Sequence, residues 1–466
     1  MALALWVGMQ MLLAGALMAQ ESTPPIGETL RGALLGHPRV QSARQATCQA
    51  TFDVLQARAA YYPRLDASLS GGNKLIDKTT RADEFGGNSS PEYDGDGLNM
   101  TLSLRQQLYD WGRTSASVEI ARLERSNARL RSRLTLDEQA NTFFLIAFDY
   151  VLQQRLVEHF QSVGARIAKG VETVEARFKA GAGRVAEMRQ AKIIELDAET
   201  ALTGAERRRD IAARVLKTEF SMQPADALAA VDMFVSTRPD IPEIIAAPRS
   251  LTARVIASNI RASRAETRRL KAERKPAFYG VLAGRAWDVT EGDQCGKSVA
   301  STHPDARNIG SAFSPEYVLY GNCHTHELTA NIEFSVPLYD GGANEAQRGA
   351  ANARRRGLES ELAAQHRQHG AESRRLQDLL LDLLTQTAEQ TQRADDLEAQ
   401  LDSERELQGR TRFNPLTLLN LELQLGQTKA RLIGLDMQAE QARMEALRIS
   451  DRLTDMLGIE IGGSGC

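Results

Sequence analysis

Two stretches of the chain alternate between apolar and polar residues. In residues 97–108, Leu98, Met100 and Leu102 fall on one face of an extended chain, while small polar residues fall on the other. Residues 326–338 repeat the pattern. A period of two predicts a β-strand with one apolar face and one polar face.

Two further stretches, residues 64–72 and 277–287, show a weaker form of this alternation, which glycines interrupt. Each of the four stretches has about ten residues, the length of a tilted strand that crosses a bilayer. A soluble antiparallel sheet would show the same alternation. The pattern therefore predicts four strands and leaves their environment open.

A helical period begins after each of the two strong strand patterns. Residues 113–177 contain no proline, and Ala116, Ile120 and Leu123 follow the alternating spacing of four and three that is typical of a coiled-coil seam. A helix of this length would extend about 100 Å at 1.5 Å per residue. Residues 343–408 predict a second long helix with smaller seam residues.

Shorter helical patterns accompany the two long ones. Leading helices are expected at residues 26–61 and 250–275, and returning helices at residues 184–220 and 416–457. Each half of the chain is therefore expected to contain two strands, one long helix, one returning helix and a leading helix.

The second half of the chain repeats the first. The segment LYDWG at 108–112 matches LYDGG at 338–342 with an offset of 230 residues, whereas Pro63 and Pro276 are 213 apart. The growing offset indicates a longer loop between the strands of the second copy. We expect a first structural repeat at 20–225, a linker or equatorial segment at 226–248 and a second structural repeat at 249–466.

The beginning of the chain resembles an export signal. Residues 1–19 are apolar and end in small residues, as a cleaved secretory segment does. No Lys or Arg precedes Arg31, which is unusual for such a signal. A buried amphipathic helix is the alternative interpretation.

Composition and motifs argue against two classes of function, nucleic-acid binding and enzyme catalysis. The formal net charge is -3, whereas nucleic-acid-binding proteins usually carry a strong basic excess. The sequence contains neither a nucleophile-elbow motif nor a phosphate-binding glycine loop. We therefore expect no enzyme activity, no cofactor and no nucleic-acid partner.

Four amphipathic strands are too few to close a membrane barrel, which needs about eight. Edges left unpaired in lipid would be prohibitively costly, so an exported chain of this kind must pool strands with other copies. Two copies would supply eight strands and three would supply twelve. Long helices that leave such a barrel together would form a tube, which indicates a conduit.

The repeated junction segments LYDWGR and PLYDGG resemble those of the TolC family of outer-membrane export channels, as does RFKAG at 177–181. The resemblance implies an α+β membrane protein with a trimeric twelve-stranded β-barrel, four strands per chain, continued by a helical coiled-coil tunnel in the periplasm. It places the protein in the Gram-negative outer membrane as a homotrimer. The strand-to-helix junction residues would be Tyr109, Asp110, Gly112, Tyr339, Asp340, Gly341 and Gly342.

The same resemblance implies partners and cargo. The channel would work with a periplasmic adaptor protein and an inner-membrane transporter of the ABC type, in contact with outer-membrane lipid. The LYDWGR junction and His37-Pro38 favour one-step (type I) protein secretion, with small-molecule efflux as the alternative. A coiled-coil scaffold or adhesin without a pore is a further alternative.

The resemblance also implies a gate at the turns between long and returning helices. Glu187 falls on the family's acidic tip position, and three copies around one axis would attract cations. Arg184, Arg410 and Arg412 lie close enough in sequence to pair with it, and Thr417 takes the acidic position in the second half, where Pro415 departs from the family pattern. Ordinary solvated charges at helix ends are the alternative interpretation.

Cys295 and Cys323 both fall in the long loop of the second half, where an oxidising environment favours a disulfide bond. A metal site built on the Cys323-His324-Thr325-His326 segment is the weaker alternative, because closely spaced donors rarely complete a site alone. Cys48 and Cys466 have no evident partner in the sequence. A metalloenzyme built on these donors ranks last among the hypotheses.

Overall fold

The computed structural model describes residues 26–73, 96–237, 250–291, 296–299, 316–319, 323–407 and 414–459. The expected signal segment at 1–19 lies outside these ranges, as do Arg410, Arg412, Cys295 and Cys466.

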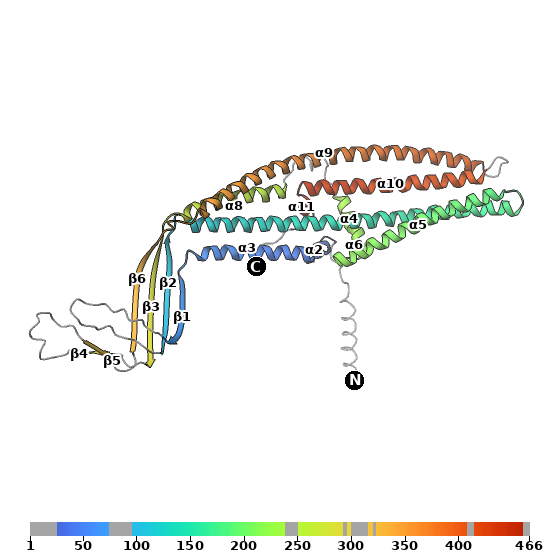
Figure 1. The fold of residues 1–466 in the computed structure, drawn as a ribbon. Helices are drawn as coiled ribbons and strands as arrows, with labels where there is room; N and C mark the ends of the chain where they lie inside the picture. Colours follow the sequence, from blue (N-terminus) through green and yellow to red (C-terminus); the bar gives the residue numbers. More distant parts are fainter. Residues whose placement is uncertain are drawn as a thin grey trace, which may run out of the picture. The chain divides into compact units, whose positions relative to one another are not determined.

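The described chain is mostly helical, with one main sheet (Figure 1). Its helices are α2 (Ile26–Gly36), α3 (Pro38–Ala59), α4 (Arg113–Lys179), α5 (Val185–Phe220), α6 (Pro224–Ser236), α8 (Leu251–Glu273), α9 (Ala343–Glu406), α10 (Pro415–Ile449) and α11 (Leu453–Met456). Its strands are β1 (Arg64–Asn73), β2 (Asp96–Tyr109), β3 (Ala277–Glu291), β4 (Gly296–Val299), β5 (Glu316–Leu319) and β6 (Cys323–Ser335). No helix in the described part of the chain combines the length and hydrophobicity needed to span a bilayer.

The main sheet is antiparallel throughout, in the order β1-β2-β3-β6. The predicted fold class, long helices with a small four-stranded sheet, is confirmed. β4 and β5 form a separate two-stranded sheet inside the long loop of the second half, which was not predicted.

The chain divides into two compact units, each of which draws on both sequence repeats. One unit contains residues 51–124 and 260–356, and therefore the sheet with the adjoining helical segments. The other contains residues 1–50, 125–259 and 357–466, and therefore the far parts of the long helices and both returning helices. The helices α4 and α9 each contribute to both units.

Several element boundaries differ from the expected ones for local reasons. The first leading helix is interrupted between α2 and α3, where Pro38 starts a new helix. The strand predicted at 326–338 ends as β6 at Ser335, two residues before Pro337, which cannot donate to a sheet ladder. The helix predicted at 416–457 ends as α10 at Ile449, because Asp451 adopts a left-handed conformation with φ 55°.

The segment between the repeats is partly helical rather than a simple linker. The helix α6 starts with Pro224 at its first position and buries Phe234 against the long helix. The ring of Phe234 lies 5.3 Å from that of Phe144 and 5.5 Å from that of Phe148. Phe220, at the end of α5, packs edge-on against Phe143. These aromatic residues belong to the hydrophobic core of the unit that contains them.

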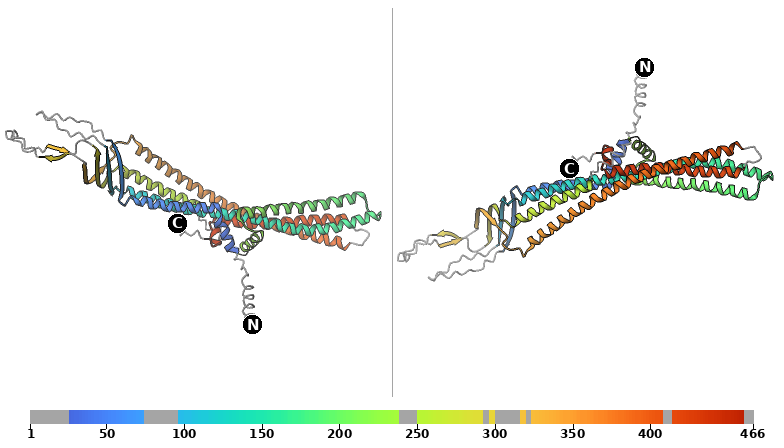
Figure 2. Two further views of the ribbon diagram at one scale, coloured as in Figure 1. Left: turned by 90° about the horizontal axis from the view of Figure 1, so that it is seen from below. Right: turned by 90° about the horizontal axis from the view of Figure 1, so that it is seen from above.

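The far parts of α4, α5, α9 and α10 run side by side within one unit (Figure 2). Two glycines allow α4 and α10 to approach closely. A Cβ atom at Gly426 would lie 2.9 Å from Val163, and one at Gly170 would overlap Leu419. The two helices therefore interlock reciprocally, each placing a branched side chain over a glycine of the other.

Candidate functional site

One face of the main sheet is apolar across all four strands. The register pairs Leu65 with Leu104, Leu104 with Leu282, and Leu282 with Ala330. The large side chains of this face are exposed, among them Leu328 at 76% and Ile332 at 75% of full exposure. An exposed apolar band of this extent in a folded chain requires lipid or another protein to cover it.

The opposite face of the sheet is polar. Arg105 on β2 donates to Glu333 on β6 at 2.9 Å, and its guanidinium also lies 4.2 Å from the centre of the Tyr279 ring on the strand between them. Asn99, Thr101, Ser103 and Asn331 share this face by register. The sheet therefore has one apolar face and one polar face, as the alternation predicted.

The strand-to-helix junctions have the same geometry in both repeats. Asp110 accepts the N–H groups of Gly112 at 3.1 Å and Thr114 at 2.6 Å, so that one carboxylate ends β2 and caps α4. Asp340 accepts those of Gly342 and Asn344, both at 3.0 Å. Gly112 and Gly342 both adopt φ 84°, where a glycine avoids the strain of a Cβ atom.

The junction carboxylates are held in their ionised form. At Asp110, burial opposes ionisation, but the hydrogen bonds from Thr114, Gln107 and Gly112 prevail and lower its pKa. At Asp340, the hydrogen bond from the Asn344 N–H lowers the pKa. The neighbouring Tyr109 and Tyr339 are exposed. Local sequence sufficed to find these turns, because their hydrogen bonds span four residues or fewer.

The far turn of the first repeat contains two of the expected gate residues. The backbone N–H of Arg184 donates to Glu187 Oε2 at 3.2 Å, so the carboxylate closes the N-terminus of its own helix, α5. Within the described ranges no ion pair joins Glu187 to an arginine. Thr417 lies in the first turn of α10, whose Asn414 cap accepts the N–H of Leu416. Pro415 begins that helix and does not interrupt it.

A buried acid that the sequence analysis missed, Glu422, lies near the N-terminal end of α10. Glu422 is 3% exposed and accepts a bond from Arg166 of α4 at 2.8 Å and one from Arg405 of α9 at 2.7 Å. Both arginine side chains reach it from partly exposed positions. Glu422 thus joins three helices. Its place in the apolar series Leu419, Glu422, Leu425 is the signal that could have revealed it.

A second charged connection joins α4 to α5. Lys192 lies 2.9 Å from Glu175 and 3.0 Å from Glu195. The bonds to these carboxylates raise the pKa of Lys192 to about 12, and Lys192 in turn lowers the pKa of Glu175. These side chains are partly exposed to solvent, whereas Glu422 is buried, so they contribute less to stability than the Glu422 network.

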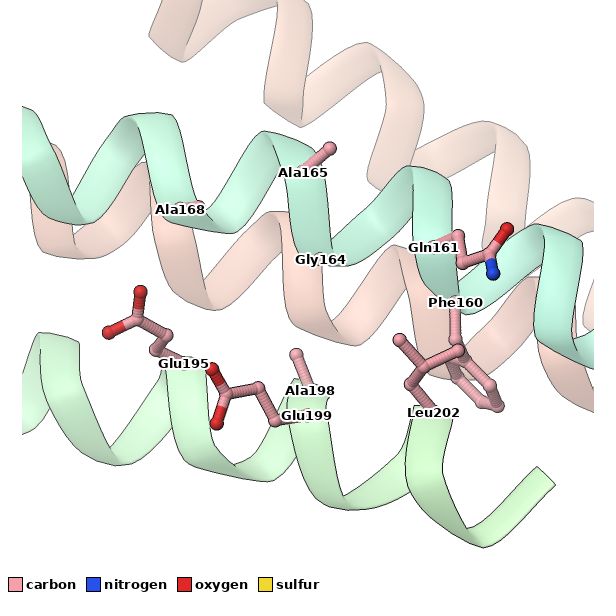
Figure 3. A pocket seen from close by; sticks show the side chains of 9 residues that line it. All are labelled: Phe160, Gln161, Gly164, Ala165, Ala168, Glu195, Ala198, Glu199 and Leu202. Carbon is pink, nitrogen blue, oxygen red and sulfur yellow. The ribbon is translucent and has the colours of Figure 1, made fainter. Parts of the chain in front are cut away.

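A shallow hollow of about 300 Å³ lies between α4 and α5 (Figure 3). Small residues at Gly164, Ala165, Ala168 and Ala198 keep the two helices from filling it, and Glu195 and Glu199 lie along one side. The residues that line the hollow are not arranged as a catalytic site is.

Cys48 in α3 takes part in a disulfide bond, a role that the sequence analysis did not foresee. The expected bridge joins Cys323, which begins β6, to Cys295, which lies outside the described residues. Of His324 and His326, the histidines of the alternative metal site, the structure describes only the backbone in β6. Across the described ranges, no three His, Cys, Asp or Glu side chains gather as metal ligands do.

The predicted bridge has a direct test. Alkylation of the denatured protein without reductant should leave Cys295 and Cys323 unlabelled, and peptide mapping should recover them joined. Labelling of both residues before reduction would show that the bridge does not form.

Comparisons with known proteins show what the chain resembles in sequence and in fold. Residues 29–218 match the family model described as "Outer membrane efflux protein". No curated protein sequence matches the chain. Residues 29–218 are thus similar to this family, and solved outer-membrane proteins share the fold of the chain.

Solved outer-membrane proteins share this fold over nearly their whole length. The outer membrane protein VceC of Vibrio cholerae is 17% identical with a TM-score of 0.68, and the match covers 93% of this chain and 96% of VceC. The CmeC channel of Campylobacter jejuni is 12% identical with a TM-score of 0.67, covering 92% and 86%. The MtrE channel of Neisseria gonorrhoeae is 15% identical with a TM-score of 0.60, covering 92% and 90%.

Proposed function

We propose that three copies of this chain pool their strands into one barrel and their helices into one periplasmic tunnel, which exports cargo. The observation that carries this proposal is the continuous apolar face across β1, β2, β3 and β6. A single chain supplies four strands, too few to enclose a pore in lipid. The likeness to solved outer-membrane channels supports the same arrangement.

The conduit would receive cargo from a periplasmic adaptor and an inner-membrane transporter of the ABC type. Type I protein secretion is supported by the LYDWGR junction and by His37-Pro38. Small-molecule efflux is the second candidate, supported by the description of the matching family.

The channel proposal is tested on protein extracted from outer membranes. We expect detergent-dependent extraction, a trimer that heat dissociates in SDS gels, and discrete conductance steps in planar bilayers. A water-soluble monomer without conductance would contradict the proposal.

The cargo is tested in the producing cell. Deletion of the gene should remove a specific large protein from the culture medium while leaving sensitivity to dyes and detergents unchanged. Increased sensitivity with an unchanged set of secreted proteins would favour efflux instead.

We further infer that Glu187 lines the constricted far end of the tunnel. Three carboxylates around one axis would favour cations, and Arg184, Arg410, Arg412 and Thr417 would surround them. The hydrogen bond to the Arg184 N–H supports this role in part, because it fixes the Glu187 side chain at the helix start.

Two substitutions separate the charge of Glu187 from its capping bond. Glu187→Gln keeps an oxygen for the Arg184 N–H and removes the charge, whereas Glu187→Ala removes both. We expect both variants to lower cation preference in planar bilayers and the alanine variant also to raise conductance, because its turn loosens. Cation preference that stays at the wild-type value in both variants would limit Glu187 to a capping role.

A further inference from the structure

Trp111, at the first junction, adopts a left-handed backbone conformation with φ 55°. This conformation strains the backbone of a non-glycine residue, and residues held in it often serve a function. The matching position in the second repeat is Gly341, which adopts φ 65° without that strain. The first repeat therefore retains a large aromatic side chain where the fold itself prefers glycine.

The Trp111 ring is 45% exposed and lies where the apolar sheet ends. The ring of Tyr109 packs edge-on against it at 5.1 Å between centroids. Lys275 Nζ lies 4.7 Å from the centre of the same ring. Tyrosine and tryptophan gather at the polar boundary of a bilayer, where the ring is apolar and its N–H or O–H meets water. The Trp111 cluster fits that boundary.

Basic side chains continue from this cluster along α8. Arg261, Arg264, Arg268, Lys271 and Lys275 follow helical spacing and are exposed. Arg268 is bound to Glu119 through two bonds of 2.7 Å. By contrast, no ion pair engages Lys271 or Lys275 within the described ranges.

Lysine is rare in this chain compared with arginine. Only ten of the 57 basic residues in the chain are lysines. Lys275 lies beside the Trp111 ring, and Lys271 lies four residues before it in the sequence. Lysine extends its aliphatic stem along apolar surface and places a compact ammonium at the polar boundary. One ammonium beside an aromatic ring, with a second lysine four residues away in the sequence, matches the phosphate of a lipid headgroup.

We propose that Trp111, Lys271 and Lys275 form a site for the phosphodiester headgroup of an anionic phospholipid at the periplasmic boundary of the outer membrane. The ring lies against the acyl-glycerol region and the two ammonium groups bind the phosphate. The inference rests on the proposal that this sheet lies in the bilayer. Anionic lipid is favoured over zwitterionic lipid because the zwitterion's own ammonium group offsets the attraction of the lysines.

Tryptophan fluorescence tests the site in the assembled full-length protein. The chain has three tryptophans, so Trp6→Phe with Trp287→Phe leaves Trp111 as the reporter. The protein is reconstituted into vesicles of phosphatidylethanolamine and phosphatidylglycerol, in which either lipid is brominated to quench nearby rings. We expect brominated phosphatidylglycerol to quench Trp111 several-fold more effectively at equal mole fraction.

Lys271→Gln with Lys275→Gln should abolish that preference. Each lysine contributes at most about fivefold to it, the factor equivalent to about 1 kcal/mol per basic residue at an anionic surface. The matched control is Arg354→Gln with Arg356→Gln, two exposed charges on α9 farther from the junction, which should keep the preference. Quenching by brominated lipid reports the lipid itself and not free phosphate.

Equal quenching by both lipids, or a preference that the lysine variant retains, would overturn the inference. Conductance is recorded on the same reconstituted protein. A conducting channel without lipid preference would remove this site alone, whereas protein that neither inserts nor conducts would remove the proposed function.

Discussion

Replacement of Arg166 and Arg405 together by methionine is expected to destabilise the far helices by about 3–5 kcal/mol. These two guanidiniums both bind the carboxylate of Glu422, which is only 3% exposed. Removal of both would leave the Glu422 charge buried and unpaired, which is the costly way to break such a network. The free energy of unfolding is measured by circular dichroism during guanidinium unfolding in detergent.

A third substitution, at Glu422, should reverse the loss of stability in the arginine double variant. Glu422→Leu in the same background should restore most of the stability, because Leu419 and Leu425 already form the neighbouring apolar positions. The matched control is Arg155→Met, which removes an exposed pair with Asp436 at 3.8 Å between the same two helices, α4 and α10. That control should change stability by no more than about 0.5 kcal/mol. An arginine double variant as stable as the control would contradict the account.

Asp451→Asn is expected to stabilise the protein above neutral pH. Burial, with a contribution from nearby Asp137, raises the pKa of Asp451 from 3.8 to about 7, although the Leu251 N–H, Arg133 and Arg254 act in the opposite direction. Because the folded pKa is the higher one, the stability linked to this group is fully present below about pH 4. It is lost as pH rises towards 7.

Three pKa units correspond to about 4 kcal/mol, and solvent screening of this partly buried carboxyl reduces the expected gain to about 1–2 kcal/mol. Asparagine also tolerates the left-handed backbone at this position. Thermal unfolding from pH 5 to 8 should therefore show a flatter profile for the variant and a higher midpoint at pH 8. Asp395→Asn, an exposed change on α9, should leave the profile as it is. Parallel profiles for wild type and Asp451→Asn would contradict this assignment.

The sheet and its junctions could be predicted because their causes are local. Alternation along 97–108 and 326–338 reflects two faces that meet different surroundings, and the register later placed Leu65, Leu104 and Leu282 on one of them. The turn at Asp110 depends on a carboxylate and two N–H groups within four residues.

Contacts between distant segments could not be predicted in the same way. Arg166 lies 256 residues from Glu422, and nothing near either residue in the sequence indicates that α4 and α10 meet there. The break after α10 was missed because it depends on Asp451, whose left-handed conformation has no glycine to announce it. Of the expected gate residues, Arg184 and Glu187 share a helix start, whereas Thr417 lies in another helix.

The junction at Asp110 also sets a rule for redesign. One carboxylate both ends β2 and starts α4, so strand and helix have no spacer that could absorb an added residue. A single insertion there would turn the start of α4 by about 100° and carry Ala116 and Ala121 off their packed side. Epitope tags and grafted peptides therefore belong in the connections between strands, where the two repeats already differ in length.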